Sequence, residues 1–457
     1  MPRDHAVVVG ASVAGLLAAR VLSDHYGRVT VLDRDALPAG LEGRRGVPQG
    51  RHAHCLLPAG AAHLEQLLPG LGAELVEAGA STCAALEQFR WIVNGYQLVR
   101  ADAGLRVILA GRPFIEGQVR RRVRALPNVE LVSGCEALGL VRGGRERRVS
   151  GVRVRADGEW TIDADLVVCA SGRSAQVPGW LASLGFPQPR EERLALNLMY
   201  ASRLLRLPPG ALGGDTMVLV NARPGLPRAL ALFAQEDDRW IASISGYGPA
   251  HRPSRDAGDF APFAATVAPD DVARAIRDAE PLTGVATHGF MAARRWRYDR
   301  LERFPEGLLA IGDAVCSFNP LYGQGMTVAA AEALALQRCL RDDGRDLARR
   351  FFAAARPPAG DAWRLATGAD LALPPVAAPR PPAVRAVNAY LRRLHSVAAN
   401  DAAAAAAFTR VAAMAQRPQS LFRPRLGLRV LRGSRHGIDT AGDAGRFGVR
   451  KQDSLAA

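Results

Sequence analysis

The sequence predicts an α/β protein in which a parallel βαβ unit is followed by an antiparallel sheet and a C-terminal helical region. Residues 5–33 read as an apolar strand, an Ala- and Leu-rich helix and a second apolar strand, the pattern of a buried parallel sheet. Short apolar runs joined by polar turns between residues 217 and 245 indicate antiparallel strands. Apolar, alanine-rich stretches beyond residue 384 are typical of helices.

The first strand (5–10) and first helix (13–22) are joined by Gly10-Ala-Ser12-Val13-Ala14-Gly15. This is the dinucleotide fingerprint G-x-G-x-x-G with serine at the second glycine. Gly10 would make the tight turn, Gly15 would allow close packing of helix on strand, and the helix N-terminus would face a pyrophosphate. The Ser12 hydroxyl can donate to a phosphate oxygen. The alternative is a glycine-rich turn that binds no ligand.

The second strand (28–33) ends at Asp33, where a carboxylate would accept the ribose hydroxyls of a dinucleotide. Arg34 follows it directly. Flavoproteins often place a basic residue here, against the adenine, so the pair favours FAD over NAD as the cofactor.

Residues 42–57 form a loop by their glycine and proline content. The loop concentrates basic and polar side chains directly after the dinucleotide unit. We expect it to cover the cofactor, with Arg45 among the residues that bind the cofactor. A solvated basic loop is the alternative. A metal site is not expected, because two histidines without a nearby acid or cysteine are too few ligands. The polar residues are Arg44, Arg45, Gln49, Arg51, His52 and His54.

A helix is predicted within residues 111–128, with Pro113 in its first turn and a solvated face of arginines. Arg112, at its start, could reach the phosphates or the ribityl chain of a flavin. The strand at 129–134 is followed by Ala137, whose backbone lies where adenine commonly sits in such folds.

The next elements are a hairpin at 151–163 with an Asp-Gly turn and an apolar strand that ends at Ser171-Gly172. Strands at 217–220, 229–233 and 240–245 then indicate the antiparallel sheet of a substrate domain.

The most specific segment is residues 307–330, which read as a buried strand, a proline- and glycine-rich loop and a helix from about Gly325 to Leu340. The strand delivers Gly312 and Asp313, and Asp313 can accept a ribityl hydroxyl. The helix N-terminus can stabilise negative charge on a reduced flavin ring. Loop and helix residues expected at the flavin are Pro320, Gly323, Gly325 and Met326.

Two helices, at 384–394 and 402–414, are predicted after a stiff proline-rich linker at 374–382. The six alanines at 402–407 favour a helix but have little to bury. Residues 409–457 carry ten basic and three acidic side chains. We expect a basic tail that packs partly and is flexible beyond residue 437. The alternative is a docking segment for an acidic carrier protein.

Composition narrows the functional classes. The chain has 457 residues, 48% hydrophobic and 23% charged, which is an ordinary globular composition of roughly three domain-sized units. No apolar run reaches the length of about 18 residues expected of a membrane-spanning helix, so we expect no transmembrane anchor. The apolar start at 6–22 is interrupted by Gly10, Ser12 and Gly15 and is followed by no cleavage site, so we interpret it as a strand and a helix and do not expect a signal peptide.

Charge and cysteine usage exclude further chemistries. The formal charge is +15, and Lys451 is the only lysine, so neither a Walker A loop nor a Schiff-base lysine is present. The arginines are scattered, which favours solvated charge over nucleic-acid binding. None of the six cysteines forms C-x-x-C, so we expect no structural zinc and a reducing, cytoplasmic setting. They are Cys55, Cys83, Cys135, Cys169, Cys316 and Cys339.

Taken together, these motifs resemble the superfamily of FAD-dependent aromatic hydroxylases and squalene epoxidases. The resemblance covers most of residues 5–345. Gly-Asp-Ala-x5-Pro-Leu-x-Gly-x-Gly-Met-Thr-Val-Ala at 312–329 is close to the squalene epoxidase form. Residues 46–54 and 316–326 are similar to bacterial epoxidases of polyether antibiotic pathways. The sequence departs from the family at Ser12 and at Ser171-Gly172, where hydroxylases have an Asp-Gly motif linked to NADPH use.

The resemblance implies a Rossmann-like FAD-binding domain of the GR2 flavoprotein type. It would consist of residues 1–75, 100–175 and 286–345, with a substrate domain at 76–99 and 176–285. A C-terminal helical region (346–436) and a tail (437–457) would follow. By the family pattern, Asp33 would bind the adenosine ribose, Arg112 the ribityl–phosphate region and Asp313 the ribityl chain.

The implied activity is insertion of one oxygen atom from O₂ through a flavin C4a-hydroperoxide, most simply epoxidation of an apolar polyene or polyketide-type intermediate. The alternatives are hydroxylation of an aromatic substrate and a flavin dehydrogenase or saturase without oxygen insertion. A halogenase is disfavoured, because its tunnel lysine and Trp-x-Trp-x-Ile-Pro motif are absent. Electrons would come from NADPH, NADH or a separate flavin reductase, and a carrier protein could present the substrate. Gln49, His52 and His54 are candidates to position the oxidant or the substrate.

Overall fold

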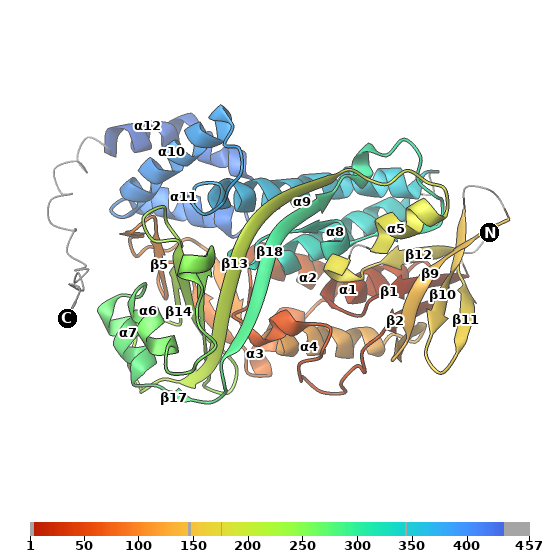
Figure 1. Cartoon of the computed structure of the whole chain (residues 1–457), viewed down its shortest axis with the longest axis horizontal. Helices are drawn as coiled ribbons and strands as arrows, with labels where there is room; N and C mark the ends of the chain where they lie inside the picture. Colours follow the sequence, from red (N-terminus) through yellow and green to blue (C-terminus); the bar gives the residue numbers. More distant parts are fainter. Residues whose placement is uncertain (1–3, 145–147, 175, 343–344, 434–457) are drawn as a thin grey trace, which may run out of the picture.

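The computed structural model describes residues 4–144, 148–174, 176–342 and 345–433. The predicted flexible tail at 437–457 lies outside these residues. A five-stranded parallel sheet occupies one end of the molecule and the C-terminal helices lie at the other, with a long antiparallel sheet between them (Figure 1).

The parallel sheet confirms the predicted βαβ unit. β1 (His5–Val9), α1 (Val13–Leu22) and β2 (Arg28–Asp33) follow the predicted bounds closely. The strand order is β19-β12-β1-β2-β8. The outer strands are β8 (Val129–Ser133), β12 (Leu166–Cys169) and β19 (Leu308–Ala310). The valines of β1 are almost fully buried because helices cover one face and β9–β11 lie beyond the other.

The predicted hairpin forms from β10 (Val149–Arg155) and β11 (Glu159–Asp163), and β9 (Glu136–Arg142) adds a strand that we did not predict. A further small sheet has the order β3-β7-β4. Its strands are β3 (Cys55–Leu56), β4 (Ser81–Ala84) and β7 (Arg106–Leu109). The segment 42–57 is therefore not all loop, because it contains β3 and a short 3-10 turn at Pro48–Arg51.

The antiparallel sheet follows the order β20-β18-β13-β16-β15-β14-β5-β6, with β17 paired to β13. Its two longest strands, β13 (Glu191–Arg206) and β18 (Ala286–Trp296), pair along most of their length. We expected β18 to open the last segment of the FAD-binding domain, but it belongs to this sheet. The other strands are β5 (Phe89–Val93), β6 (Tyr96–Gln97), β14 (Met217–Val220), β15 (Arg228–Ala234), β16 (Trp240–Tyr247), β17 (Glu280–Pro281) and β20 (Cys316–Ser317).

The helices surround these sheets, and α8 packs against α1, α2 and α9. Their bounds are α2 (Pro58–Leu67), α3 (Leu71–Glu77), α4 (Arg112–Arg124), α5 (Gln176–Ser183), α6 (Phe260–Ala265), α7 (Asp270–Arg277), α8 (Gly325–Arg341), α9 (Leu347–Asp370), α10 (Pro382–Ala398), α11 (Ala402–Ala412) and α12 (Pro424–Gly433).

Three expectations for polar and small side chains were wrong. Arg120 of α4 is buried and donates to the Gly40 carbonyl oxygen at 2.8 Å, so the arginine face of that helix is not wholly solvated. The proline-rich linker is a packed turn, because Val376 is fully buried and Arg380 donates to nearby backbone carbonyl oxygens. The alanines of α11 pack into a core, where small side chains permit close approach.

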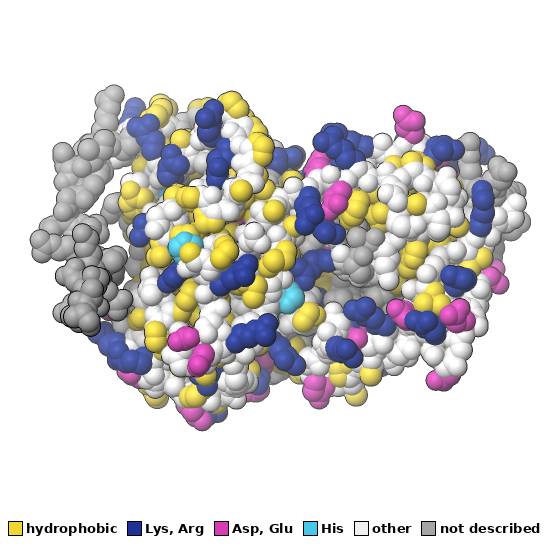
Figure 2. Space-filling view, in the orientation of Figure 1, with side chains coloured by type: hydrophobic (Ala, Val, Ile, Leu, Met, Phe, Trp, Pro, Cys, Tyr) yellow, Lys and Arg dark blue, Asp and Glu magenta, His cyan; other side chains and the backbone are white. Residues whose placement is uncertain are grey.

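The six cysteines are free and buried, as expected of small hydrophobic side chains. On the face in Figure 2, basic side chains are spread over both ends of the molecule, and acidic side chains are interspersed among them. Within the described residues, no helix is both long and apolar enough to span a bilayer.

Candidate cofactor and substrate site

One cavity of about 500 Å³ extends from the βαβ unit across the antiparallel sheet to the C-terminal helices. This volume lies within the range of roughly 300–1,000 Å³ typical of small-molecule sites. Every predicted site residue lines the cavity except Gly15 and Arg45. Those that line it are Gly10, Ser12, Val13, Ala14, Asp33, Arg34, Gln49, His52, His54, Arg112, Ala137, Gly312, Asp313, Pro320, Gly323, Gly325 and Met326.

The glycines of the fingerprint make the close contacts that their positions require. Gly10 has a φ of +106°, and a Cβ there would lie 2.5 Å from the Ala170 carbonyl oxygen. A Cβ on Gly15 would lie 1.8 Å from the Gly10 carbonyl oxygen. Gly15 therefore acts in packing, outside the cavity wall. The first-turn N–H groups of α1, which lack intrahelical partners, are left at the cavity edge.

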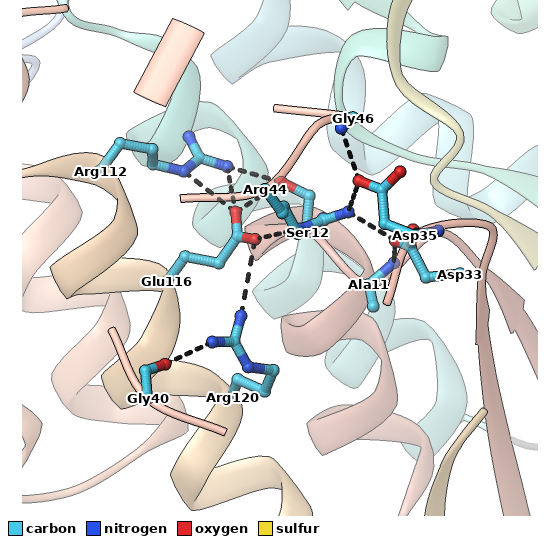
Figure 3. A network of polar contacts seen from close by, with 10 residues as sticks. All are labelled: Ala11, Ser12, Asp33, Asp35, Gly40, Arg44, Gly46, Arg112, Glu116 and Arg120. Atoms are coloured by element: carbon cyan, nitrogen blue, oxygen red, sulfur yellow. Dashed lines mark hydrogen bonds and ion pairs between the residues drawn. The ribbon is translucent and has the colours of Figure 1, made fainter. Parts of the chain in front are cut away.

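Beside α1 lies a buried network of three arginines and three carboxylates, here called the arginine–carboxylate cluster (Figure 3). Arg44 is at its centre. Its guanidinium lies 3.0 Å from Asp33, 3.1 Å from Asp35 and 2.9 Å from Glu116. Arg112 pairs with Glu116 at 3.1 Å, and Arg120 approaches the same carboxylate at 3.9 Å. The formal charges of the six groups sum to zero, which offsets much of the cost of burying them.

Glu116 connects this cluster to the fingerprint. Burial raises the pKa of Glu116, but Arg112 and Arg44 more than offset this, so its pKa is lowered and the group is ionised. Ser12 donates its hydroxyl to Glu116 at 2.9 Å and accepts from Arg112 at 2.6 Å. A serine has one hydroxyl proton, so while this bond holds Ser12 cannot donate to a phosphate as expected from the sequence.

Asp33 retains room for one further donor. One of its carboxylate oxygens accepts from the Ala11 N–H at 2.8 Å and from Arg44. The other accepts from the Asp35 N–H at 2.9 Å. A carboxylate offers about four acceptor sites, so one remains for a hydroxyl from the cavity.

Of the six members of the cluster, only Asp33 and Arg112 were predicted as site residues. Arg44, Asp35, Glu116 and Arg120 were missed. We selected Arg45 from the basic pair, but its side chain is exposed and Arg44 points inward. Loop residues have no periodicity that assigns a face, so the sequence holds no signal to choose between them. The sequence does hold a signal for Glu116. Arg112, Glu116 and Arg120 are spaced i, i+4 and i+8 on a predicted helix and therefore share one face.

Asp313 enters the cavity from a short turn after β19, and Gly312 before it has a φ of +69°. Burial raises the pKa of Asp313, and the nearby Arg173 and Arg112 oppose that shift. Behind the turn, the fully buried Glu332 of α8 accepts from the Gly312 N–H at 2.6 Å. Burial raises the pKa of Glu332 to about 8, so this group is mostly uncharged at neutral pH. Glu332 was not predicted as a site residue. The sequence signal for it is a single carboxylate within an alanine-rich, apolar helix.

The loop before α8 is held by a second buried network. Asp370 of α9 accepts from Asn319 at 2.8 Å, Tyr247 at 2.9 Å and Tyr322 at 3.0 Å. Asn319 also accepts from the Leu321 N–H at 3.0 Å. The helical region therefore fixes the loop that carries Pro320 and Gly323.

Asp370→Ala is expected to lower the free energy of unfolding by about 2–4 kcal/mol, because it removes the shared acceptor of three buried donors. Asp370→Asn keeps an acceptor oxygen, so a smaller loss, about 1–2 kcal/mol, is expected. Urea unfolding at neutral pH would measure both. Equal stability of Asp370→Ala and wild type would show that the network does not hold the loop.

His52 and His54 lie together on the cavity wall and are uncharged at neutral pH. Burial, together with His288, lowers the pKa of His52 to about 3, and burial and Arg112 lower that of His54 to about 4. His54 donates its Nδ1–H to the His52 carbonyl oxygen at 2.9 Å, which leaves its Nε2 as an acceptor. His52 contacts Ser202 at 2.7 Å and packs edge-on against Tyr200.

The remainder of the cavity wall is mostly apolar and comes from the antiparallel sheet and the C-terminal helices. Its polar side chains include Asn94, Asn221, Ser243, Ser245, Asn388 and Arg392. The described carboxylates that line the cavity are Asp33, Glu136 and Asp313, all at its βαβ end. The contribution of α10 and α11 was not predicted. Large apolar side chains of this half are Phe89, Trp91, Met217, Phe233, Leu391 and Phe408.

Residues 4–345 match the protein-family model that is described as "FAD binding domain". The chain belongs to this FAD-binding family. The superfamily of FAD-dependent monooxygenases predicted from the motifs is thereby confirmed, and the protein is an FAD-dependent oxidoreductase.

Curated relatives of this FAD-dependent oxidoreductase include one that is named a monooxygenase and one that is named an epoxidase. Protein Rv3254 of Mycobacterium tuberculosis is 37% identical, over 74% of this chain and 73% of its own length. The 6-methylpretetramide 4-monooxygenase of Streptomyces rimosus is 28% identical, over 76% of this chain and 77% of its own. Squalene epoxidase 1 of Arabidopsis thaliana is 25% identical, over 77% of this chain and 64% of its own.

The fold of the FAD-dependent oxidoreductase is also that of known flavoproteins. A flavoprotein/dehydrogenase from Cytophaga hutchinsonii superposes with a TM-score of 0.69, covering 96% of this chain and 99% of that one. At 13% identity this likeness shows the fold alone. It confirms the predicted α/β architecture with a parallel sheet and an antiparallel sheet.

Proposed function

We propose that the protein is a monooxygenase that transfers one oxygen atom of O₂ to an uncharged, apolar small molecule by epoxidation of an alkene in a polyene- or polyketide-type substrate. The observation that carries the proposal is the shared cavity, in which cofactor-motif residues and a mostly apolar wall without described carboxylates face the same space. Epoxidation of an alkene removes no proton from the substrate. A wall of apolar side chains and uncharged histidines is therefore sufficient for it.

FAD fits the residues at the βαβ end. Asp33 has one acceptor site left for a ribose hydroxyl, and the first turn of α1 with Arg112 suits the pyrophosphate. Asp313 would accept from the ribityl chain, and Arg34 and Ala137 would border the adenine. The N-terminus of α8, at Gly325 and Met326, would face the negative charge of the reduced ring. Bound and reduced, FAD supplies the activation of O₂ and the oxygen transfer.

The chain's own contribution to catalysis is to orient the substrate and exclude water. The aromatic side chains Phe89, Trp91 and Phe408 stack in one group, with ring centroids about 5 Å apart, and form a rigid apolar wall. Exclusion of water strengthens the effect of the α8 N-terminus, because its dipole acts in a medium of low dielectric constant. His52, fixed by Ser202 and Tyr200, would hold the substrate at the reacting end.

His52→Ala is expected to lower the amount of oxygenated product formed per NADPH oxidised by roughly tenfold, because the substrate loses its fixed position. FAD content should stay at the wild-type value, since His52 is not among the expected FAD ligands. The comparison needs product quantification beside NADPH consumption. If His52→Ala forms as much product per NADPH oxidised as the wild type, His52 has no role in the mechanism.

Hydroxylation of an aromatic ring is the second candidate. It is favoured by the 28% identity to a monooxygenase named for 6-methylpretetramide. Both reactions insert oxygen, whereas a dehydrogenase or saturase does not.

The deciding experiment uses FAD-reconstituted full-length protein, oxygen-18 gas and 2-isopropenylnaphthalene, which offers both an alkene and an aromatic ring. NADPH, NADH and chemically reduced free flavin serve as separate electron sources, and the last mimics a separate reductase. A labelled epoxide supports the proposal, and a labelled naphthol supports the second candidate. Reduction and reoxidation of the flavin with no labelled product from any source would overturn both. The control is Arg45→Gln, which changes an exposed side chain beside the arginine–carboxylate cluster and should give the same products as the wild type.

A further inference from the structure

We propose that His395 and Thr409 form a polar recognition point in the apolar half of the cavity, which binds a carbonyl or hydroxyl oxygen of the substrate. The inference deepens the proposed function and rests on it in one respect, namely that the cavity holds the substrate. It assigns a substrate class, an apolar molecule that carries one oxygen function at a distance from the reacting carbon.

Two unpaired polar atoms carry the inference. His395 of α10 and Thr409 of α11 both line the cavity, with relative exposures of 5% and 3%. His395 Nε2 and Thr409 Oγ1 are buried and have no hydrogen-bond partner among the described residues. A buried polar atom without a partner costs about 1–3 kcal/mol, so two on one cavity wall indicate a ligand that supplies the partners.

The contacts of His395 fix which of its nitrogens carries the proton. The Asn94 side-chain amide donates to His395 Nδ1 at 2.8 Å, so Nδ1 is an acceptor. Burial lowers the pKa of His395 to about 4, so the ring is uncharged at neutral pH and carries its single proton on Nε2. The Phe408 ring, edge-on at 4.4 Å between centroids, holds the imidazole in this orientation. Nε2 is therefore a fixed donor that requires an acceptor oxygen.

The position of the recognition point in the cavity allows it to orient the substrate. α10 and α11 lie at the opposite end of the molecule from α1 and β12, which border the cofactor end (Figure 1). The cavity wall that joins the two ends is mostly apolar, and the antiparallel sheet contributes Met217 and Phe233 to it. A substrate whose oxygen is bound at His395 thus presents its apolar remainder toward Asp313, which selects the orientation as well as the molecule.

The test measures binding of two probes of almost the same shape, 2-acetylnaphthalene with a carbonyl and 2-isopropenylnaphthalene without one. Binding is followed through the absorption of the oxidised, FAD-loaded protein in the absence of any electron donor. Wild type should bind the ketone roughly 5- to 10-fold more tightly than the alkene, the ratio expected for one to two buried hydrogen bonds. Thr409→Val and His395→Phe should each bring the ratio toward one with the alkene's affinity unchanged. His395→Gln, which keeps an N–H donor, should restore part of it.

The inference is overturned if wild type shows no preference for the ketone, if it binds neither probe, or if both variants keep the preference. Thr409→Val keeps the test valid even if His395→Phe does not fold, because valine matches threonine in shape. No turnover occurs in this assay, so its outcome is independent of oxygen transfer. A preference for the ketone, together with no labelled product in the oxygen-18 experiment, would support the recognition point and reject the monooxygenase proposal. Labelled product without a preference for the ketone would support the monooxygenase proposal and reject the recognition point.

Discussion

Arg44→Met lowers the free energy of unfolding by about 3–5 kcal/mol, the expected result of removing one partner from a buried ion cluster. The guanidinium of Arg44 lies within 3.1 Å of three carboxylates, and its side chain is only 7% exposed. Methionine fills much of the same volume, so the loss reports charge and hydrogen bonds more than packing. Asp33, Asp35 and Glu116 would remain buried with less compensating charge.

The adjacent residue offers a matched control for this prediction. Arg45→Met changes the same residue type one position along, but the Arg45 side chain is exposed, and we expect a change within about 0.5 kcal/mol. Urea unfolding of the two variants and wild type, without FAD, gives the comparison. FAD affinity should fall in Arg44→Met alone, because Asp33 and the α1 end are positioned by the cluster. Similar stabilities of the two variants would show that the cluster contributes nothing to folding.

Glu332 is expected to make the stability of the protein depend on pH in an unusual direction. Its pKa is raised from 4.5 to about 8 by burial, so the folded state holds a proton that the unfolded state releases above pH 4.5. The contribution of Glu332 to stability is therefore fully present below that pH and is lost as pH rises to about 8. Over this range the loss from Glu332 is about 4–5 kcal/mol.

Glu332→Gln isolates this effect, because glutamine keeps an oxygen acceptor for the Gly312 N–H and cannot ionise. Unfolding free energies of both proteins would be measured from about pH 5 to about pH 9. At about pH 5 the unfolding free energies of the two proteins should be similar, and their difference should grow in favour of Glu332→Gln as the pH rises. A difference that stays constant with pH would mean that Glu332 is not a buried, uncharged carboxyl in the folded protein.

These two predictions concern residues on which the sequence was least informative. The βαβ unit was read almost to the residue, because strand, turn and helix are set by local patterns of apolar residues and glycines. Asp33 and Asp313 were likewise found from their positions at strand ends. Arg44 was not, since a loop gives no rule for which of two adjacent arginines turns inward.

The far half of the site illustrates the same limit. The helices α10 and α11 were predicted as helices, but nothing in their local pattern states that His395 and Thr409 face a cavity shared with β5. Asp370 is more than a hundred residues from Tyr247, and the two meet only because α9 packs over the antiparallel sheet.

The fold class, the FAD-binding family and the location of the cofactor motifs could be read from the amino-acid sequence. Each depends on a short segment whose glycines, apolar periodicity and strand-end carboxylates have the same meaning wherever the segment folds. The folded arrangement was needed to show which charges are buried together, which carboxyl is uncharged and which helices complete the cavity. These depend on burial and on contacts between distant segments, and the electrostatic energy of a group is set by that surrounding rather than by its neighbours in the chain.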